Sequence, residues 1–176
     1  YTQVAAGWFH TVLLKSDGTA DACGWNENGQ CNIPALGGAV TYTQVAAGGH
    51  HTVLLKSDGT AVACDLNGDG QCNIPAVDGA VKYTQVATGW HHTVLLKSDG
   101  TAVACGLNED GQCNIPAVGG AVTYTQVAAG WFHTVLLKSD GTAVACGRND
   151  HGQCSIPGSS HSSAEEQWDS GCMWLE

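Results

Sequence analysis

The chain repeats itself with a fixed period of 41 residues. The phrase YTQVA begins at Tyr1, Tyr42, Tyr83 and Tyr124, and no residue is inserted or lost between these positions. A constant period in this range is typical of solenoids, propellers and other repeat arrays, in which each unit packs on its neighbours. We therefore divide the chain into a repeat domain, residues 1–157, and a non-repeating tail, residues 158–176. The four repeats span 1–41, 42–82, 83–123 and 124–157.

Each repeat contains strand signals, and none contains a helical period over three turns. YTQVA is a short β-rich run that ends at glycine, and HTVLLK and TAVAC flank the turn signal SDG, which predicts a hairpin. The QCNIP segment that follows contains proline, which favours an edge or a connecting segment over a central strand. The sequence predicts an all-β, propeller-like array with three to four short strands per repeat.

The hairpin strands are apolar on both faces. Alternation places His10, Val12 and Leu14 on one face of the first hairpin. Thr11, Leu13 and Lys15 fall on the other. One hairpin cannot bury both sets, so we expect neighbouring repeats to stack face to face.

The first repeat differs from the others at one position of this pattern. Asp21 stands where the later repeats have Val62, Val103 and Val144. A buried carboxylate without a partner is costly, so this face of repeat one is expected to meet solvent. The array then has an open end, although a merely peripheral position for Asp21 gives the same pattern.

Cysteines bracket a glycine-rich turn in every repeat. The four pairs are Cys23/Cys31, Cys64/Cys72, Cys105/Cys113 and Cys146/Cys154. Each pair lies between the end of one strand and the next segment, which is a natural place for a local disulfide, and closing so short a loop stabilises a fold by about 2–3 kcal/mol. We predict four such disulfides, and therefore an oxidising, extracellular location for a secreted protein.

Two alternatives to the disulfides stay open. The cysteines could be buried thiols, or they could bind a metal, although two cysteines eight residues apart supply half of a tetrahedral zinc site at an unusual spacing. Cys172 has no partner in this pattern and could bridge to another chain.

Several phrases that recur together resemble the regulator-of-chromosome-condensation repeat. The likeness covers about residues 1–157, and the first copy is VAAGWFHTVLLKSDGTADACGWNENGQCNIPA. The hallmarks in that copy are Gly7 with His10, Asp17-Gly18, and the turn Gly24, Asn26, Gly29, Gln30. The short period is similar to a compact branch of the family that includes an inhibitor of a β-lactamase. Here cysteine replaces the aromatic residue that commonly precedes the turn.

The resemblance implies a β-propeller, usually of seven blades. Four repeats at the family's usual angle would leave the ring open. The chain is then a fragment, or it closes unusually tightly, or other copies complete the ring. Exposed apolar blade faces favour association, and head-to-tail contacts that do not close generate filaments.

The residues before each repeated histidine vary, while the phrase around them does not. We predict that they reach one rim of the array and bind a protein partner, because aromatic side chains dominate binding hot spots. The alternative is that they pack blade against blade. The candidate partner-binding residues are Trp8, Phe9, His50, Trp90, His91, Trp131 and Phe132.

Metal and cofactor sites have little support. The repeated histidines His10, His51, His92 and His133 are expected to hydrogen-bond within their own blades. Asp65, Asn67 and Asp69 match the first half of a calcium loop, but the twelfth position is Ala76 rather than the bidentate glutamate of an EF-hand. We expect a solvated turn there, with no metal, no cofactor and no catalytic residues.

The charge narrows the choice of partners. The net charge is −10, with no basic patch of the kind that binds nucleic acid or an anionic membrane. In the tail, Trp168, Cys172 and Trp174 could contact another copy. The sequence favours a secreted structural or protein-binding scaffold that associates with itself, not an enzyme. A carbohydrate-binding module and a protein inhibitor of an enzyme remain alternatives.

Overall fold

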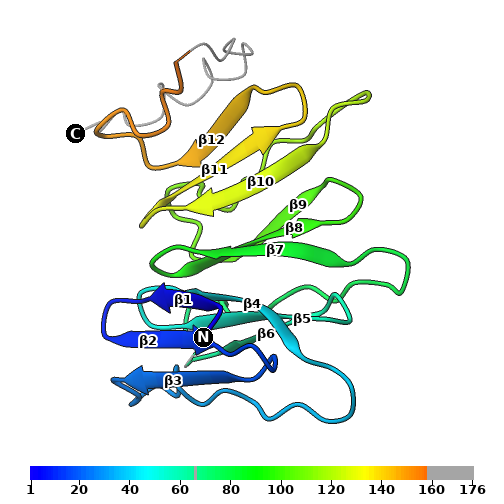
Figure 1. The fold of residues 1–176 in the computed structure, drawn as a ribbon. Helices are drawn as coiled ribbons and strands as arrows, with labels where there is room; N and C mark the ends of the chain where they lie inside the picture. The colour runs from blue at the N-terminus through cyan, green and yellow to red at the C-terminus, as the bar shows by residue number, and fades with distance from the viewer. Residues whose placement is uncertain (66, 158–176) are drawn as a thin grey trace, which may run out of the picture.

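The computed structural model describes residues 1–65 and 67–157 (Figure 1), and within them twelve strands form four three-stranded sheets, or blades. Blade 1 contains β1 (Gln3–Ala6), β2 (His10–Leu14) and β3 (Ala20–Gly24), and blade 2 contains β4 (Tyr42–Ala47), β5 (Thr52–Lys56) and β6 (Ala61–Cys64). Blade 3 contains β7 (Tyr83–Thr88), β8 (His92–Lys97) and β9 (Ala102–Gly106), and blade 4 contains β10 (Tyr124–Ala129), β11 (His133–Lys138) and β12 (Ala143–Gly147). The predicted all-β class is confirmed. The tail residues Trp168, Cys172 and Trp174 lie outside the described residues.

Each blade is an antiparallel meander in chain order, held by the turn that the sequence predicts. In blade 1 the second and third strands meet at Lys15, whose N–H donates to Thr19 O at 2.8 Å. Gly18 has a φ of 80°, a left-handed conformation that glycine adopts without strain. The Asp17 carboxylate accepts a hydrogen bond from the Thr19 N–H at 2.9 Å. This contact explains why the SDGT motif recurs in every repeat.

The QCNIP segment forms a turn and a connection instead of a fourth strand, so the described residues contain three strands per blade. In the first copy Asn26 Oδ1 accepts the N–H of Cys31 at 2.8 Å. The carbonyl of Pro34 then accepts the Tyr42 hydroxyl at 2.8 Å. This connection therefore fastens the start of one blade to the end of the blade before it.

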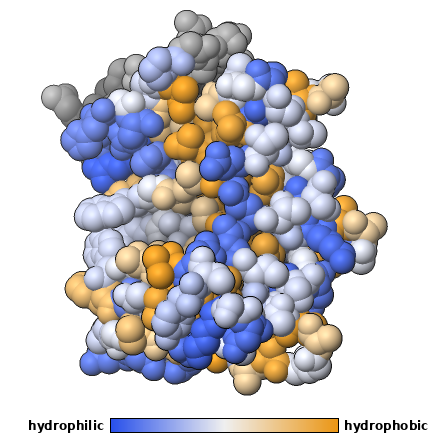
Figure 2. All heavy atoms as spheres, viewed as in Figure 1, coloured by the Kyte–Doolittle hydropathy of each residue, from blue (hydrophilic) through white to orange (hydrophobic). Residues whose placement is uncertain are grey.

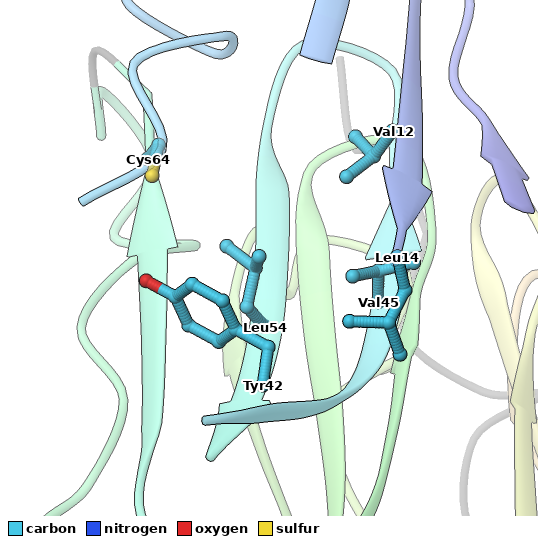
Figure 3. Close-up of a cluster of buried hydrophobic side chains, with 6 residues drawn as sticks. All are labelled: Val12, Leu14, Tyr42, Val45, Leu54 and Cys64. Carbon is cyan, nitrogen blue, oxygen red and sulfur yellow. The ribbon is translucent and has the colours of Figure 1, made fainter. Parts of the chain in front are cut away.

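The hydrophobic core lies between blades, in three similar layers. In the first layer Val12 and Leu14 of blade 1 pack on Val45 and Leu54 of blade 2 beside Tyr42 (Figure 3). Alternate residues of β2 are buried, which confirms the predicted alternation of its faces. The inner strands β1, β4, β7 and β10 contact one another in succession, and each second strand packs on the first strand of the next blade.

The row of blades is open, as predicted. Tyr1 is 71% exposed, whereas the equivalent Tyr42 is 4% exposed. At the other end Leu137 is 37% exposed, whereas the equivalent Leu55 is 6% exposed. Asp21 lies on the exposed face of blade 1 and pairs with Lys15 at 2.8 Å. On the surface shown in Figure 2, hydrophobic and hydrophilic residues alternate over all four blades.

Candidate functional site: an aromatic rim

The rim loops are positioned by a buried hydrogen-bond chain that crosses from blade to blade. Thr52 of blade 2 donates its hydroxyl to Gln30 O of blade 1 at 2.7 Å. Because a hydroxyl has one proton, His10 Nε2 must be the donor in its 2.9 Å contact with Thr52 Oγ1. The expectation that these histidines bond within their own blades was therefore wrong.

The same chain recurs at the other two interfaces. His51 contacts Thr93, which donates to Gln71 O, and His92 contacts Thr134, which donates to Gln112 O. Burial lowers the pKa of His51 to about 3 and that of His92 to about 4, so both rings are neutral at physiological pH. The histidines therefore support the loops as uncharged hydrogen-bond donors.

A glycine before each histidine is required by the same packing. A Cβ on Gly48 would collide with the His51 ring and would lie 2.6 Å from Gly89 O of the next blade. The Gly-x-x-His phrase thus lets each loop fold over its own histidine and lie against the loop of the next blade. The two variable residues inside the phrase are left pointing to the rim.

The innermost rim side chains meet although they come from separate blades. The Trp8 ring of blade 1 stacks on Trp90 of blade 3, with 5.4 Å between centroids. Trp8 also lies 4.9 Å from Trp131 of blade 4. Gly49 of blade 2 makes room for this cluster, because a Cβ there would collide with the Trp90 ring. The loops of all four blades therefore converge on one point.

Four further rings contact the tryptophans of this cluster. Phe132 lies 4.9 Å from Trp90 in an edge-to-face contact, and His91 lies 4.4 Å from the same ring. Phe9 and His50 lie 6.0 Å apart and contact Trp8. The structure brings all seven predicted partner-binding residues into one continuous surface, which we call the aromatic rim: Trp8, Phe9, His50, Trp90, His91, Trp131 and Phe132.

The aromatic rim is partly packed and partly open to solvent. Trp131 is 60% exposed, Phe9 57% and Trp8 40%, whereas Trp90 and Phe132 are half-buried. A cavity of about 160 Å³ lies beneath the three tryptophans, among the glycine backbones of the four loops. Trp90 and Phe132 therefore pack within the rim, while Trp8, Phe9 and Trp131 face solvent.

Sequence reasoning missed Trp25 and Arg148, which extend the rim. Trp25 contacts Phe9 at 5.9 Å and His50 at 5.5 Å, and the Arg148 guanidinium lies 5.6 Å from the centre of the Phe132 ring. Both follow the Cys-Gly pair of their repeat, and their N–H groups donate to Phe9 O and Phe132 O. This position varies among the repeats as the rim positions do, and that variation was the available signal.

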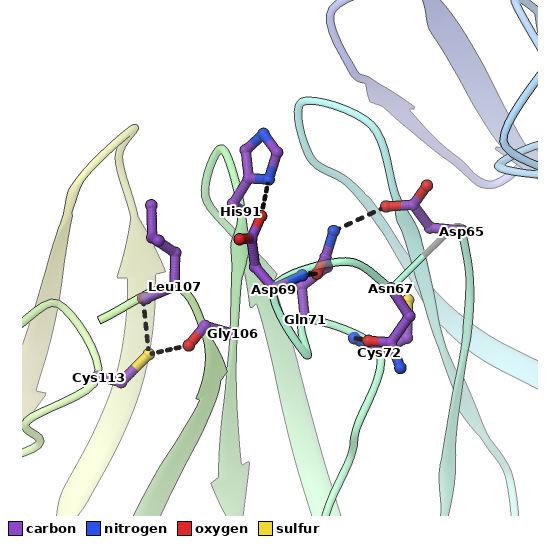
Figure 4. Close-up of polar contacts among 9 residues, drawn as sticks. All are labelled: Asp65, Asn67, Asp69, Gln71, Cys72, His91, Gly106, Leu107 and Cys113. Carbon is purple, nitrogen blue, oxygen red and sulfur yellow. Dashed lines mark hydrogen bonds and ion pairs between the residues drawn. The ribbon is translucent and has the colours of Figure 1, made fainter. Parts of the chain in front are cut away.

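The calcium candidates have other partners in the structure (Figure 4). Asp65 accepts a hydrogen bond from Gln71, and Asp69 Oδ2 lies 2.5 Å from His91 Nδ1, which ties the turn of blade 2 to the aromatic rim. Asn67 Oδ1 accepts the N–H of Cys72. Within residues 1–65 and 67–157 no three His, Cys, Asp or Glu side chains are grouped as a metal site would require.

The structure holds thiols where the sequence predicted four disulfides. No disulfide joins the members of any predicted pair, which are Cys23/Cys31, Cys64/Cys72, Cys105/Cys113 and Cys146/Cys154. In the last two repeats the physical reason is that the two thiols of a pair point to different acceptors. In the last repeat the Cys154 thiol donates to Arg148 O of its own turn at 3.3 Å. The Cys146 thiol instead faces the blade before it, where it donates to Gln112 O at 3.6 Å.

The cysteines form a row that runs across the blades. Burial raises the pKa of Cys72 to about 12, and Cys64 of the same repeat and Cys105 of the next repeat add to the rise. Cys105 Sγ lies 3.6 Å from Gln71 O, immediately before Cys72. Cys72 therefore has one cysteine neighbour in its own repeat, Cys64, and another in the next repeat, Cys105.

The sequence profile of the regulator of chromosome condensation (RCC1) repeat matches residues 1–30, 83–112 and 124–153, which together make up half of the chain. The chain belongs to the RCC1 repeat family. Comparison with curated protein sequences gives no match.

Solved structures of propellers share the fold. Prp20p from Saccharomyces cerevisiae is 24% identical with a TM-score of 0.73, and the match covers 89% of this chain and 45% of Prp20p. Human WBSCR16 is 21% identical with a TM-score of 0.73, and the match covers 84% of this chain and 48% of that one. The CRINKLY WD40 ectodomain of the Arabidopsis thaliana receptor kinase ACR4 is 19% identical with a TM-score of 0.59, over 82% of this chain and 48% of that one.

The chain thus spans less than half the length of these propellers, in agreement with an open row of four blades. The described residues contain no helix with the length and apolarity needed to cross a membrane.

Proposed function

We propose that this RCC1-repeat chain is a protein-binding scaffold whose contact surface is the aromatic rim. One observation carries the proposal: loops of four blades bring seven aromatic and imidazole rings together, and Trp8, Phe9 and Trp131 among them are exposed. Exposed aromatic clusters with a polar surround mark interaction sites, because rigid rings supply contact area at a low entropic cost. No catalytic activity is proposed.

Structural neighbours support a role in protein binding. Prp20 was solved in complex with Kap60, and the study of Prp20p concerns its binding to Gsp1p and histones. Those partners belong to Prp20. For the present chain, with a net charge of −10, we propose a protein partner and neither nucleic acid nor a membrane.

We further propose that the protein is secreted and that its cysteines are oxidised outside the cell. Eight cysteines in four evenly spaced pairs suit an extracellular domain, and two structural neighbours are receptor-kinase ectodomains. Oxidation would link Cys23 to Cys31, and the other three pairs likewise, with an external disulfide such as oxidised glutathione taking up the two electrons. Thiols that donate to a carbonyl, such as those of Cys146 and Cys154, would turn to their partners. The low charge and small apolar residues of each blade make such a link valuable for stability.

A tryptic map of the non-reduced protein tests these disulfides. Cleavage after Lys15, Lys56 and Lys82 places Cys23 and Cys31 in one peptide, and Cys64 and Cys72 in the next. Links within repeats leave these two peptides separate, each lighter by two hydrogens than its reduced form. A joined pair would instead indicate a link between blades, and unchanged masses would contradict oxidation.

The partner-binding proposal is tested by affinity capture from conditioned culture medium. We expect the wild-type chain to retain a protein that the double variant Phe9→Ala/Trp131→Ala loses. Tyr1→Ala is the control, because Tyr1 is an equally exposed aromatic residue outside the rim. Loss by both variants alike, or binding to immobilised glycans instead of protein, would contradict the proposal and favour the carbohydrate-binding alternative.

Self-association is the last part of the proposal. The chain has two exposed sheet faces, and repeats of nearly identical sequence offer equivalent contacts to another copy. The tail residues Trp168, Cys172 and Trp174 stay candidates for the same contact.

A further inference from the structure

Every interface between blades uses the same three hydrogen bonds. At the first interface the Val45 N–H donates to Gln3 Oε1 at 2.9 Å, the Thr52 hydroxyl donates to Gln30 O, and His10 donates to Thr52. The second interface repeats the set from Val86 and Thr93, and the third from Val127 and Thr134. We call the side that supplies valine and threonine the leading face, and the side that supplies glutamine and histidine the trailing face.

The two ends of the row carry the two halves of a fourth such set. The leading face of blade 1 presents Val4 and Thr11, which are equivalent to Val45 and Thr52. The trailing face of blade 4 presents Gln126, His133 and the Gln153 carbonyl. Among the described residues, Gln126 and His133 make none of the hydrogen bonds that their equivalents make at the internal interfaces.

The apolar surfaces at the two ends are complementary as well. Val4 is 68% exposed, and its equivalents Val45 and Val86 are 2% and 4% exposed because a trailing face covers them. On the other end Leu137 is 37% exposed, while the equivalent Leu96 is 6% exposed beneath a leading face. Each end therefore exposes the apolar side chains that the other end buries at the internal interfaces.

We infer that the trailing face of blade 4 docks the leading face of blade 1 of a second copy of this chain, in the register of the internal blade interfaces. This rests on the self-association proposed above and names its surfaces. The contact is heterologous, so copies that join in this way either close into a ring of blades or extend as a filament. The occupant is a second copy because its blade 1 carries the half of the hydrogen-bond set that the trailing face of blade 4 lacks.

Asp21 sets the strength of this contact. It replaces the valine that packs at the edge of each internal layer, and its pair with Lys15 lies on the leading face of blade 1. The equivalents Val62 and Val144 are only partly buried, so the carboxylate can keep contact with water in the joined form. Desolvating part of this ion pair weakens the contact without preventing it.

Sedimentation velocity of the full chain, in reductant so that no disulfide contributes, tests the inference. We expect the mass to rise with concentration in multiples of the 18.1 kDa chain. Asp21→Val should lower the dissociation constant at least tenfold, and Thr11→Val should raise it about tenfold. Thr93→Val is the matched control, because it makes the same change at an internal interface and should leave the dissociation constant unchanged.

Three results would overturn the inference. One is a monomer at every concentration for both the wild type and Asp21→Val. Another is association that Thr11→Val and Leu137→Glu leave unchanged, which would place the contact elsewhere. The third is a monomer whose melting temperature falls in the Leu137→Glu variant. This fall would show that the chain's own residues cover the trailing face of blade 4, so that no second copy docks there. The variant Phe9→Ala/Trp131→Ala should associate normally, so failure of docking and failure of partner binding are separable.

Discussion

Buried polar residues at the blade interfaces of this molecule have their hydrogen-bond partners in a neighbouring repeat. Thr52 is buried at 0% exposure and serves His10 and Gln30 of the blade before it. Gly48 is needed because His51 lies over it and the Gly89 carbonyl approaches from the next blade. The Gly-x-x-His-Thr phrase therefore recurs in every repeat because its residues form the interface between neighbouring repeats.

Thr93→Val should destabilise the fold by about 1–3 kcal/mol. The change keeps the shape of the side chain but leaves His51 Nε2 without its acceptor and Gln71 O with only the weak Cys105 thiol donor at 3.6 Å, both in a buried layer. Urea denaturation measures the free energy of unfolding. Thr11→Val is the control, since Thr11 lies on the leading face at the open end, and its effect on the monomer should be below about 0.5 kcal/mol. Equal effects would contradict the hydrogen-bond chain.

The free energy of unfolding should fall as the pH drops below 6.5. Burial lowers the pKa of His51 to about 3 and that of His92 to about 4, so between these values and 6.5 the unfolded chain binds protons that the folded chain does not. Each histidine then contributes a slope of up to about 1.4 kcal/mol per pH unit. Urea denaturation at pH 7.5, 6.0 and 5.0 measures this. A free energy that does not change over this range would contradict the neutral, buried histidines.

The reduced cysteines should react slowly. Burial raises the pKa of Cys72 to about 12, so at pH 8 its thiolate fraction is about a thousandfold below that of a free cysteine. Timed alkylation of the reduced protein with iodoacetamide, followed by peptide mapping, compares Cys72 with Cys23, which is exposed. We expect Cys23 to be modified long before Cys72. Modification of the two cysteines at equal rates would show that the Cys72 thiol is not buried.

At the scale of elements, the loop after the first strand of each blade determines what the molecule can bind. Four such loops, 41 residues apart in sequence, bring the Trp8 ring within 5.4 Å of Trp90 and within 4.9 Å of Trp131. The second blade contributes Gly49, whose lack of a side chain admits the Trp90 ring. The aromatic rim thus depends on a small residue in one repeat as much as on large residues in the others.

Gly49→Ala should disturb the aromatic rim, whereas Gly79→Ala should not. An added Cβ at Gly49 would collide with the Trp90 ring and lie 2.8 Å from the Trp90 carbonyl, while a Cβ at Gly79 meets nothing within 4 Å. We expect Gly49→Ala to cost about 1–3 kcal/mol and to change the near-ultraviolet circular dichroism of the tryptophans. Identical spectra for the two variants would contradict the packing of Trp90 over blade 2.

At the scale of the whole molecule, the sequence predicted the strands of one repeat and the open array of stacked repeats, but not which residues bond across each interface. The strands, the SDG turn, the alternation at Val12 and Leu14 and the exposed face marked by Asp21 all follow from local rules. The partners of His10 and the neighbours of Cys72 depend on the angle between sheets, which no pattern inside a repeat encodes. Convergence of the rim follows from the same angle, whereas Trp25 could have been found from the variation of its position among the repeats.

We propose that an open row of four blades presents the aromatic rim to a protein partner. Calorimetric titration of the captured partner into the wild-type chain and into Trp131→Ala is the decisive test of this proposal. Trp131 is 60% exposed, so its removal should spare the fold while weakening binding at least tenfold, as for a hot-spot residue. Equal affinity for the two proteins would contradict the claim and place the binding surface elsewhere on the blades.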